Sequence, residues 1–177
     1  KNNSSSFFVV SDSEARKLYF MTLNGEILSE IGNGKKGSED GSGENVSFCY
    51  PFGISVYKNK YLYVADTCNN SIRMVNMDTK EVSTLINGNS GLKNPMDLDI
   101  IDDTMIIIDF NSINLTKYNL KTNITEVIEC KECKNKSIKL LRYRNKLYFI
   151  NEEENSIFSL NKEGIAEKFI DFNKFNI

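Results

Sequence analysis

The four cysteines carry the most reactive side chains in this sequence. Cys130 and Cys133 form a Cys-x-x-Cys pair, and Cys49 and Cys68 lie 19 positions apart. Two disulfides, free thiols and a four-cysteine zinc site are the chemistries open to them. A thioredoxin-like redox role requires a βαβ unit around the pair, which the sequence does not predict. We expect two disulfides in an exported protein or free thiols in a cytosolic one, and no metal site.

Two glycine-rich motifs suggest ligands that their surroundings do not support. Gly32-Asn33-Gly34-Lys35-Lys36-Gly37 matches the dinucleotide pattern, but a loop follows it where a phosphate-binding helix would be needed. Asp40-Gly41-Ser42-Gly43-Glu44 offers oxygen ligands, but it lacks the length and the terminal Glu of a calcium loop. The sequence contains no histidine, which removes the commonest general base and metal ligand. We therefore predict no catalytic residue, cofactor or metal within these residues.

The overall charge and hydropathy exclude two classes of partner. The net charge of −2 provides no basic surface for nucleic acid. No apolar run approaches the roughly 20 residues that a membrane-spanning helix needs. Asn-x-Ser/Thr sequons exceed the number expected from composition, which favours a secretory or extracellular location over the cytoplasm. The seven sequons begin at Asn2, Asn3, Asn45, Asn69, Asn114, Asn123 and Asn135.

The elements that must position these residues are short β-strands in a repeating order. Four apolar runs each end in an acidic or amide residue, which we call the anchor, and each is followed by two further short runs. The anchors Asp12, Asp66, Asp109 and Asn151 are 54, 43 and 42 positions apart. A period near 42 with β-branched and aromatic runs is typical of a four-stranded propeller blade. The longer first interval reflects an insertion in the connection between residues 31 and 51.

An inner strand precedes the anchor run in three of the repeats. These inner strands are predicted over residues 52–56, 96–100 and 137–141, and the first repeat begins directly with its second strand. The strand order, with the strands of a blade lettered a to d from the inside outwards, is thus b-c-d followed by three complete a-b-c-d blades. The predicted bounds are 1–32 for blade 1, 33–88 for the inserted loop and blade 2, 89–130 for blade 3 and 131–177 for blade 4. All four belong to one all-β domain.

The second repeat resembles an NHL repeat over about forty residues. Its Asp-Gly-x-Gly turn, Pro-x-Gly-Ile strand start, Leu-Tyr-Val-Ala-Asp strand and Asn-x-x-Ile-Arg strand lie between Asp40 and Arg73. The third repeat keeps Pro95, Asp97 and Asp109 but lacks the Ile-Arg pair, and the fourth keeps mainly the apolar pattern. The resemblance implies a β-propeller, and NHL proteins resemble six-bladed rings. About four blades, with blade 1 lacking its inner strand, would form part of such a ring.

The motif residues are expected to hold the fold together. Glycines permit positive φ angles or close backbone contact, and proline suits the first position of a strand. Asp66 and Asn69 are expected to cap the turn that follows their strand, and Arg73 to pair with a carboxylate such as Asp66. The complete structural set is Asp40, Gly41, Gly43, Pro51, Gly53, Asp66, Asn69 and Arg73.

A non-catalytic scaffold that binds proteins or ligands is the function this pattern favours. The inserted loop, residues 33–47, is the predicted partner-contact surface, through Lys35, Lys36, Glu39, Asp40 and Glu44. Its deletion is expected to abolish binding and to spare the fold. The alternative is a propeller lyase or hydrolase with its catalytic residues mostly outside this segment, because the channel-facing strands offer only Asp97 and Asp99. The predicted partners are proteins, including further blades in the same or another chain.

Overall fold

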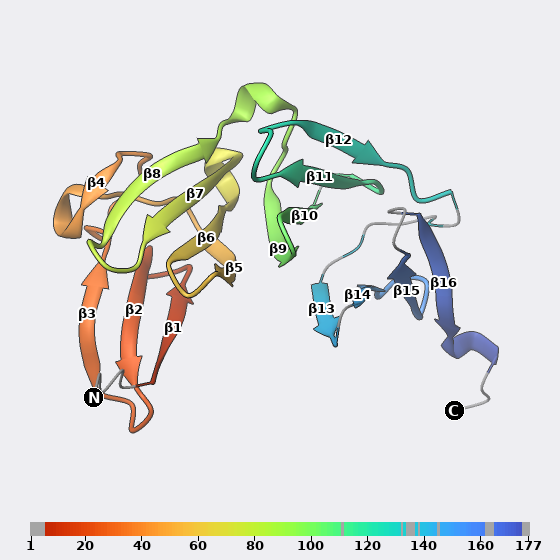
Figure 1. The fold of residues 1–177 in the computed structure, drawn as a ribbon, viewed down its shortest axis with the longest axis horizontal. Coiled ribbons are helices and arrows are strands. Elements are labelled where there is room, and N and C mark those ends of the chain that lie inside the picture. Colours follow the sequence, from red (N-terminus) through yellow and green to blue (C-terminus); the bar gives the residue numbers. More distant parts are fainter. Residues whose placement is uncertain are drawn as a thin grey trace.

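The computed structural model describes residues 6–110, 112–131, 133, 137, 139–144, 146–161 and 165–174. Short β-branched and aromatic runs form strands, and these strands form four separate antiparallel sheets. Figure 1 shows the sheets following one another along an open arc, with the N-terminus and the C-terminus at opposite ends. The described helical segments are single 3-10 turns, and none is long and apolar enough to cross a membrane.

The strand order follows the predicted repeat. Blade 1 has three strands, β1 (Phe7–Asp12), β2 (Lys17–Thr22) and β3 (Ile27–Ile31). Blade 2 contains β5 (Pro51–Tyr57), β6 (Tyr61–Asp66), β7 (Ser71–Asn76) and β8 (Glu81–Ile86), with the short β4 (Gly41–Ser42) added beside β8. Among the residues that the structure describes, blade 1 therefore has no inner strand, as predicted, whereas β4 was not expected.

Blades 3 and 4 are complete four-stranded sheets. Blade 3 consists of β9 (Pro95–Ile101), β10 (Thr104–Asp109), β11 (Leu115–Asn119) and β12 (Thr125–Ile128). Blade 4 consists of β13 (Lys139–Tyr143), β14 (Lys146–Asn151), β15 (Ser156–Leu160) and β16 (Ala166–Asp171). The inner strands β5, β9 and β13 lie along the concave side of the arc (Figure 1).

The hydrophobic core is divided among the spaces between successive blades. Leu18 and Phe20 of blade 1 pack with Val64 and Val75 of blade 2. Two further clusters join blade 2 to blade 3 and blade 3 to blade 4. Each blade is thus apolar on the faces that meet a neighbour, because alternate strand residues point to opposite sides of a sheet.

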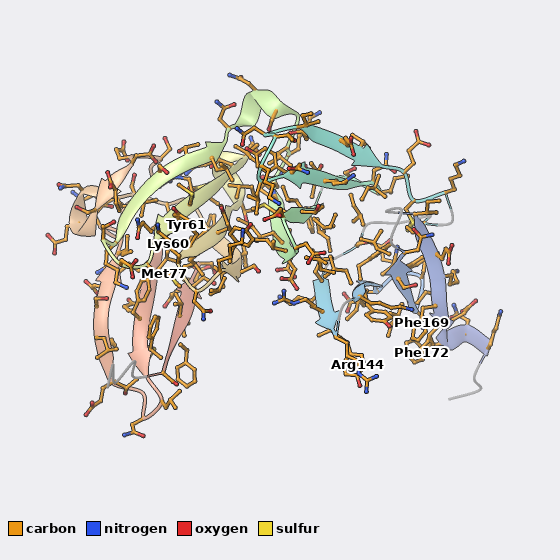
Figure 2. All side chains as sticks on the ribbon, in the orientation of Figure 1. Lys60, Tyr61, Met77, Arg144, Phe169 and Phe172 are labelled. Atoms are coloured by element: carbon orange, nitrogen blue, oxygen red, sulfur yellow. A yellow bond between two sulfur atoms is a disulfide. The ribbon has the colours of Figure 1, made fainter. Side chains whose placement is uncertain are left out.

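The two end blades each leave one apolar face uncovered. Phe8 and Val10 are exposed on the side of blade 1 that points away from blade 2. Leu141, Tyr143 and Phe169 are exposed on blade 4. Figure 2 shows Phe169 and Phe172 at the free end of blade 4. Exposed apolar surface of this kind usually marks a site of contact with other protein.

Candidate functional site

The connections between blades gather on one face of the molecule. In an antiparallel blade, the turn between the second and third strands and the link to the next blade lie at the same end. The inserted loop, both cysteine pairs and the residues that follow the anchors therefore share this face, which we call the connection face. The contacts that support this face decide which of its side chains remain available to a partner.

Arg73 fixes the inserted loop to blade 2. Its side chain is fully buried, and its Nη1 donates to Asp66 Oδ2 at 2.9 Å and to the Ser47 carbonyl at 3.0 Å. Nη2 donates to the Glu39 carbonyl at 2.8 Å and to Asp40 Oδ1 at 2.7 Å. One guanidinium thus joins the middle of the loop and its C-terminal end to β7, which its planar set of five donors allows.

Asp66 is the buried partner of this arginine. Its Oδ1 accepts the Cys49 N–H at 2.6 Å, and its Oδ2 accepts from Asn69 Nδ2 at 2.7 Å as well as from Arg73. Burial raises the pKa of Asp66, against the lowering effect of its hydrogen bonds with Asn69, Cys49 and Arg73. The expectation that Asp66 caps its own turn is wrong, because its side chain makes no cap bond to the 3-10 turn at Thr67–Asn69.

The anchors fall into two structural classes. Asp66 and Asp109 reach back to the N–H of the residue two positions before Pro51 and Pro95, respectively. Asp12 and Asn151 accept the N–H of the residue three positions ahead, at 2.8 and 3.1 Å, and so cap their own turns. In blades 2 and 3 the inner strand begins with a proline, and the anchor carboxylate accepts a backbone N–H just before that strand.

The Asp-Gly-x-Gly motif covers the outer edge of blade 2. Asp40 Oδ2 accepts the Thr84 N–H at 3.1 Å, and Gly41 and Ser42 pair with β8 as β4. Gly41 and Gly43 have φ angles of +133° and +57°, so both motif glycines occupy the backbone region predicted for them. The motif therefore closes a sheet edge that would otherwise present unpaired N–H groups.

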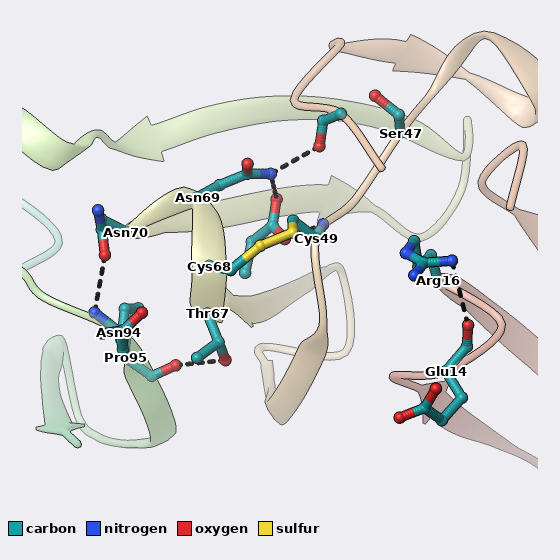
Figure 3. Close-up of a disulfide and its surroundings, with 12 residues drawn as sticks. Glu14, Arg16, Ser47, Cys49, Thr67, Cys68, Asn69, Asn70, Asn94 and Pro95 are labelled. Atoms are coloured by element: carbon teal, nitrogen blue, oxygen red, sulfur yellow. Dashed lines mark hydrogen bonds between the residues drawn. A yellow bond between two sulfur atoms is a disulfide. The ribbon is translucent and has the colours of Figure 1, made fainter. Parts of the chain in front are cut away.

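Two disulfides hold the connection face. The structure joins Cys49 to Cys68 and Cys130 to Cys133, with Cα atoms 5.3 and 5.2 Å apart. Figure 3 shows the first bridge beside the residues that link blade 2 to blade 3. There Thr67 Oγ1 donates to the Pro95 carbonyl at 2.7 Å, a contact that the sequence analysis did not predict. Cys130 and Cys133 are buried in the core between blades 3 and 4.

All five predicted contact residues are exposed, but two of them also make contacts within the fold. Lys35, Lys36 and Glu44 are exposed on the inserted loop. Asp40 is bound to Arg73 and Thr84, and the Glu39 carboxylate accepts from Ser47 Oγ. The loop is therefore part of the fold, and its deletion is expected to destabilise blade 2 rather than to spare it.

The concave side presents a second polar group of residues. A pocket of about 340 Å³ is lined by β5, β9 and β13 and includes Ser55, Asp97, Asp99, Lys139 and Arg142. Asp97 accepts the Leu140 N–H at 2.8 Å and pairs with Lys139 at 3.0 Å. Asp99 accepts from Ser55 at 2.8 Å and lies 3.5 Å from Arg142 Nε. Both carboxylates predicted to face the channel are thus engaged in bonds between blades.

Sequence reasoning did not identify the partners of these two aspartates. Ser55, Lys139 and Arg142 lie on three inner strands, and nothing in one strand's sequence shows which residue of the next blade it meets. Alignment of the repeats could have identified one of these pairs, because Ser55 and Asp99 occupy the same position of β5 and β9. The described residues contain no group of three or more His, Cys, Asp or Glu side chains that could hold a metal ion.

The comparisons with known proteins agree with the repeat pattern. No family model matches the sequence. The chain is 34% identical over 77 residues to NHL repeat-containing protein 2 of Gallus gallus and of Bos taurus. That match covers 44% of this chain, which spans about a tenth of the length of those relatives.

Solved structures show the same fold at low sequence identity. Virginiamycin B lyase from Staphylococcus aureus has a TM-score of 0.66 and 14% identity, covering 95% of this chain and 56% of that chain. A chain of the nidogen/laminin complex has a TM-score of 0.69 and 16% identity, covering 94% of this chain and 60% of that chain. These similarities show the fold alone, and the fold is that of a β-propeller.

Proposed function

Because this chain is a partial β-propeller built from NHL-type repeats, we propose that it is a non-catalytic scaffold that binds a protein partner through its connection face. The observation that carries the proposal is the attachment of the inserted loop to blade 2 by Arg73. That attachment holds Lys35, Lys36 and Glu44 exposed on an ordered support. An ordered loop loses less conformational entropy on binding, which favours affinity.

The proposed chemistry of binding is charge recognition on a rigid loop. Lys35 and Lys36 are adjacent cations, and Glu44 is an anion on the same loop. Charged rim residues of this kind set the association rate and the choice of partner more than the total affinity. A chain of similar fold comes from the nidogen/laminin complex, which is an assembly of proteins, and this supports binding of a protein rather than catalysis.

The test is a comparison of two triple variants in partner capture. Lys35→Ala/Lys36→Ala/Glu44→Ala removes three exposed charges of the loop and keeps Glu39 and Asp40, which make contacts within the fold. Lys121→Ala/Lys146→Ala/Glu81→Ala removes the same number of exposed charges outside the connection face. We expect a partner captured by the unmodified protein to bind the loop variant at least ten times more weakly by calorimetry. Equal affinities of the partner for the two variants would refute the role of this loop.

We also propose that the protein works in an oxidising compartment. All four cysteines are paired, and burial of Cys130 and Cys133 within an inter-blade core leaves no thiol of these residues for other chemistry. Paired cysteines of this kind are typical of exported proteins. Thiol counting on the natural protein without reductant is expected to find none, and four free thiols would contradict this location.

An enzyme is the second candidate, because the similar folds include virginiamycin B lyase. In this chain the channel-facing carboxylates of Asp97 and Asp99 are bound to Leu140, Lys139, Ser55 and Arg142. A carboxylate that is bound in this way is better suited to holding neighbouring blades together than to transferring a proton. Any catalytic group would have to come from residues outside this segment, so we favour the scaffold.

A further inference from the structure

Tyr50 is an exposed aromatic residue at a backbone position that disfavours it. It precedes the proline that begins β5 and has a φ angle of +56°, whereas Asn94 holds the same position before β9 with a φ angle of +60°. In both blades the carbonyl of this residue accepts the N–H of the residue after the anchor, so the turn itself is shared. Asn adopts this left-handed conformation readily, but a bulky side chain rarely does. The turn therefore does not explain the aromatic ring.

The packing of Tyr50 does not explain its ring either. The residue is 36% exposed and belongs to none of the three apolar clusters of the described residues. Its hydroxyl has no hydrogen-bond partner within the described part of the chain. Tyrosine and arginine are the residue types that most often dominate the affinity of a protein interface. An exposed tyrosine at a position that suits Asn better is thus a candidate contact residue.

Arg16 lies against Tyr50 and has no anionic partner. Its guanidinium carbon is 5.5 Å from the centroid of the Tyr50 ring. Nη1 makes only long contacts, at 3.4 Å to the Gly34 carbonyl and at 3.5 Å to the Glu14 carbonyl (Figure 3). Nη2 is neither bonded nor buried, and no described carboxylate pairs with this side chain. The guanidinium can therefore donate to a carboxylate of another molecule.

The inserted loop brings two further cations to the same part of the connection face. Lys35 directly follows Gly34, which Arg16 contacts. The backbone of Lys36 pairs with that of Phe48, two positions before Tyr50. Both lysines are exposed, and neither forms an ion pair with a described residue. Three cations without anionic partners thus lie on the two segments that meet beside Tyr50.

The acidic residues of the loop do not neutralise these cations. The Glu39 carboxylate accepts from Ser47, and Asp40 is bound to Arg73. Glu44 belongs to a 3-10 turn that contacts β3. Around Tyr50 itself the charges without a described partner are three cations and one anion, Glu14, so the local charge favours an acidic ligand.

We propose that Arg16, Lys35 and Tyr50 bind an acidic segment of the protein partner, which rests on the scaffold function proposed above. One carboxylate of the segment accepts from Arg16 Nη2, and a second is attracted by Lys35. The Tyr50 ring provides apolar contact area, and its hydroxyl is free to donate. Because the ring holds the guanidinium, Arg16 loses less conformational entropy on binding than a free side chain would.

A short acidic peptide tests the proposal without knowledge of the partner. The probe is acetyl-Gly-Glu-Asp-Glu-Asp-Gly-amide, titrated at low ionic strength into isotopically labelled protein and followed by NMR. We expect saturable shifts of the backbone amides of residues 14–17, of residues 33–37 and of Tyr50. The peptide acetyl-Gly-Gln-Asn-Gln-Asn-Gly-amide has nearly the same shape without the charges, and we expect it to cause no saturable shifts.

Two pairs of variants separate this site from a general effect of charge. Arg16→Gln and Tyr50→Asn are each expected to weaken peptide binding by about tenfold or more. Asn94 shows that Asn fits the backbone at this position, so we expect Tyr50→Asn to fold. The controls are Arg144→Gln and Tyr143→Asn, which change a similar exposed pair, 5.2 Å apart, at the β13–β14 turn outside the connection face. We expect both controls to bind the peptide normally.

Three results of the peptide titrations would overturn the proposal. These are absence of saturable shifts, equal binding of the uncharged peptide, and equal weakening by the site variants and the control variants. The proposed function fails in a different way, through equal partner affinity of the loop triple variant and its control. If the loop triple variant lost the partner while Arg16→Gln and Tyr50→Asn bound it normally, the acidic site would be refuted and the scaffold would stand.

Discussion

At the scale of single residues, the buried pair Asp66–Arg73 has the largest expected effect on stability. Both side chains are fully buried, and Arg73 Nε has no hydrogen-bond partner among the described residues. A buried ion pair is not by itself a large net gain, because both charges lose their hydration. Removal of one partner is nevertheless costly, since it leaves the other charge buried and unpaired.

We expect Asp66→Ala to destabilise the protein by about 3–5 kcal/mol, the usual cost of breaking a buried pair. Asp66→Leu/Arg73→Met removes both charges and is expected to lose less stability than the single variant Asp66→Ala. Chemical denaturation measures both, and Asp78→Ala, which removes an exposed carboxylate, provides the control. Partner binding by folded Asp66→Ala is expected to remain normal. An unchanged melting temperature of Asp66→Ala would show that the pair does not support the fold.

Tyr63 makes the free energy of unfolding decrease at alkaline pH. Its side chain is buried between blades 2 and 3, and this burial raises its pKa from 10.0 to about 12. The folded state therefore holds the phenol proton more tightly than the unfolded state does. The stabilising contribution is complete below pH 10 and is lost as the pH rises from 10 towards 12.

We expect Tyr63→Phe to remove this part of the pH dependence. Two pKa units correspond to about 3 kcal/mol at most. Unfolding free energies between pH 9 and pH 12 would show a smaller decrease for Tyr63→Phe than for the unmodified protein. Tyr143→Phe, at an exposed position of blade 4, is the matched control. Parallel curves for Tyr63→Phe and the unmodified protein would contradict the assignment.

At the scale of elements, the edge of β8 depends on the inserted loop. Asp40 accepts the Thr84 N–H and contacts Arg73, and β4 pairs beside it. We expect Asp40→Ala to destabilise the protein by about 1 kcal/mol, because the carboxylate is half-exposed and its contacts are partly screened. Hydrogen exchange is expected to become faster over residues 81–86. Unchanged exchange there would show that β4 holds without the aspartate.

The strands and their order could be predicted because each strand carries its own pattern. Alternating β-branched and aromatic residues identified β6 and β10, and the anchors set the register of the blades. β4 could not be predicted, because Gly41 and Ser42 have little intrinsic preference for strands and pair only through contacts made by Asp40. In blade 4 the inner strand lies at Lys139–Tyr143, two residues beyond the predicted run, where its pairing with β14 fixes it.

The candidate site was less predictable than the strands. Its contact residues were chosen from an inserted loop by charge, and charge does not distinguish an exposed side chain from one bound within the fold. Asp40 belongs to the second class because Arg73, which is distant in sequence, reaches it. The pairing of Asp66 with Arg73 was predicted, and the structure confirms it. The bond of Asp66 to the Cys49 N–H was missed, since that N–H meets the carboxylate only after β5 and β6 have paired.

At the scale of the whole molecule, the uncovered faces of blades 1 and 4 favour association. Interfaces of the same apolar type are buried between each pair of successive blades. We propose that further blades, in the same or another chain, cover these faces. For the 177-residue protein we expect concentration-dependent association in sedimentation experiments, which Phe169→Glu reduces. A stable 20.2 kDa monomer at every concentration would contradict this.

The division of the core into three inter-blade clusters has a consequence for cooperativity. Each blade is stabilised only by the blades beside it, so the molecule behaves as a short one-dimensional chain of coupled units. Blade 2 has an apolar cluster on each side and also holds the Arg73 network and the Cys49–Cys68 bridge. Local unfolding therefore requires the least free energy at the two ends of the arc, and we expect blade 2 to be the last unit to lose its structure.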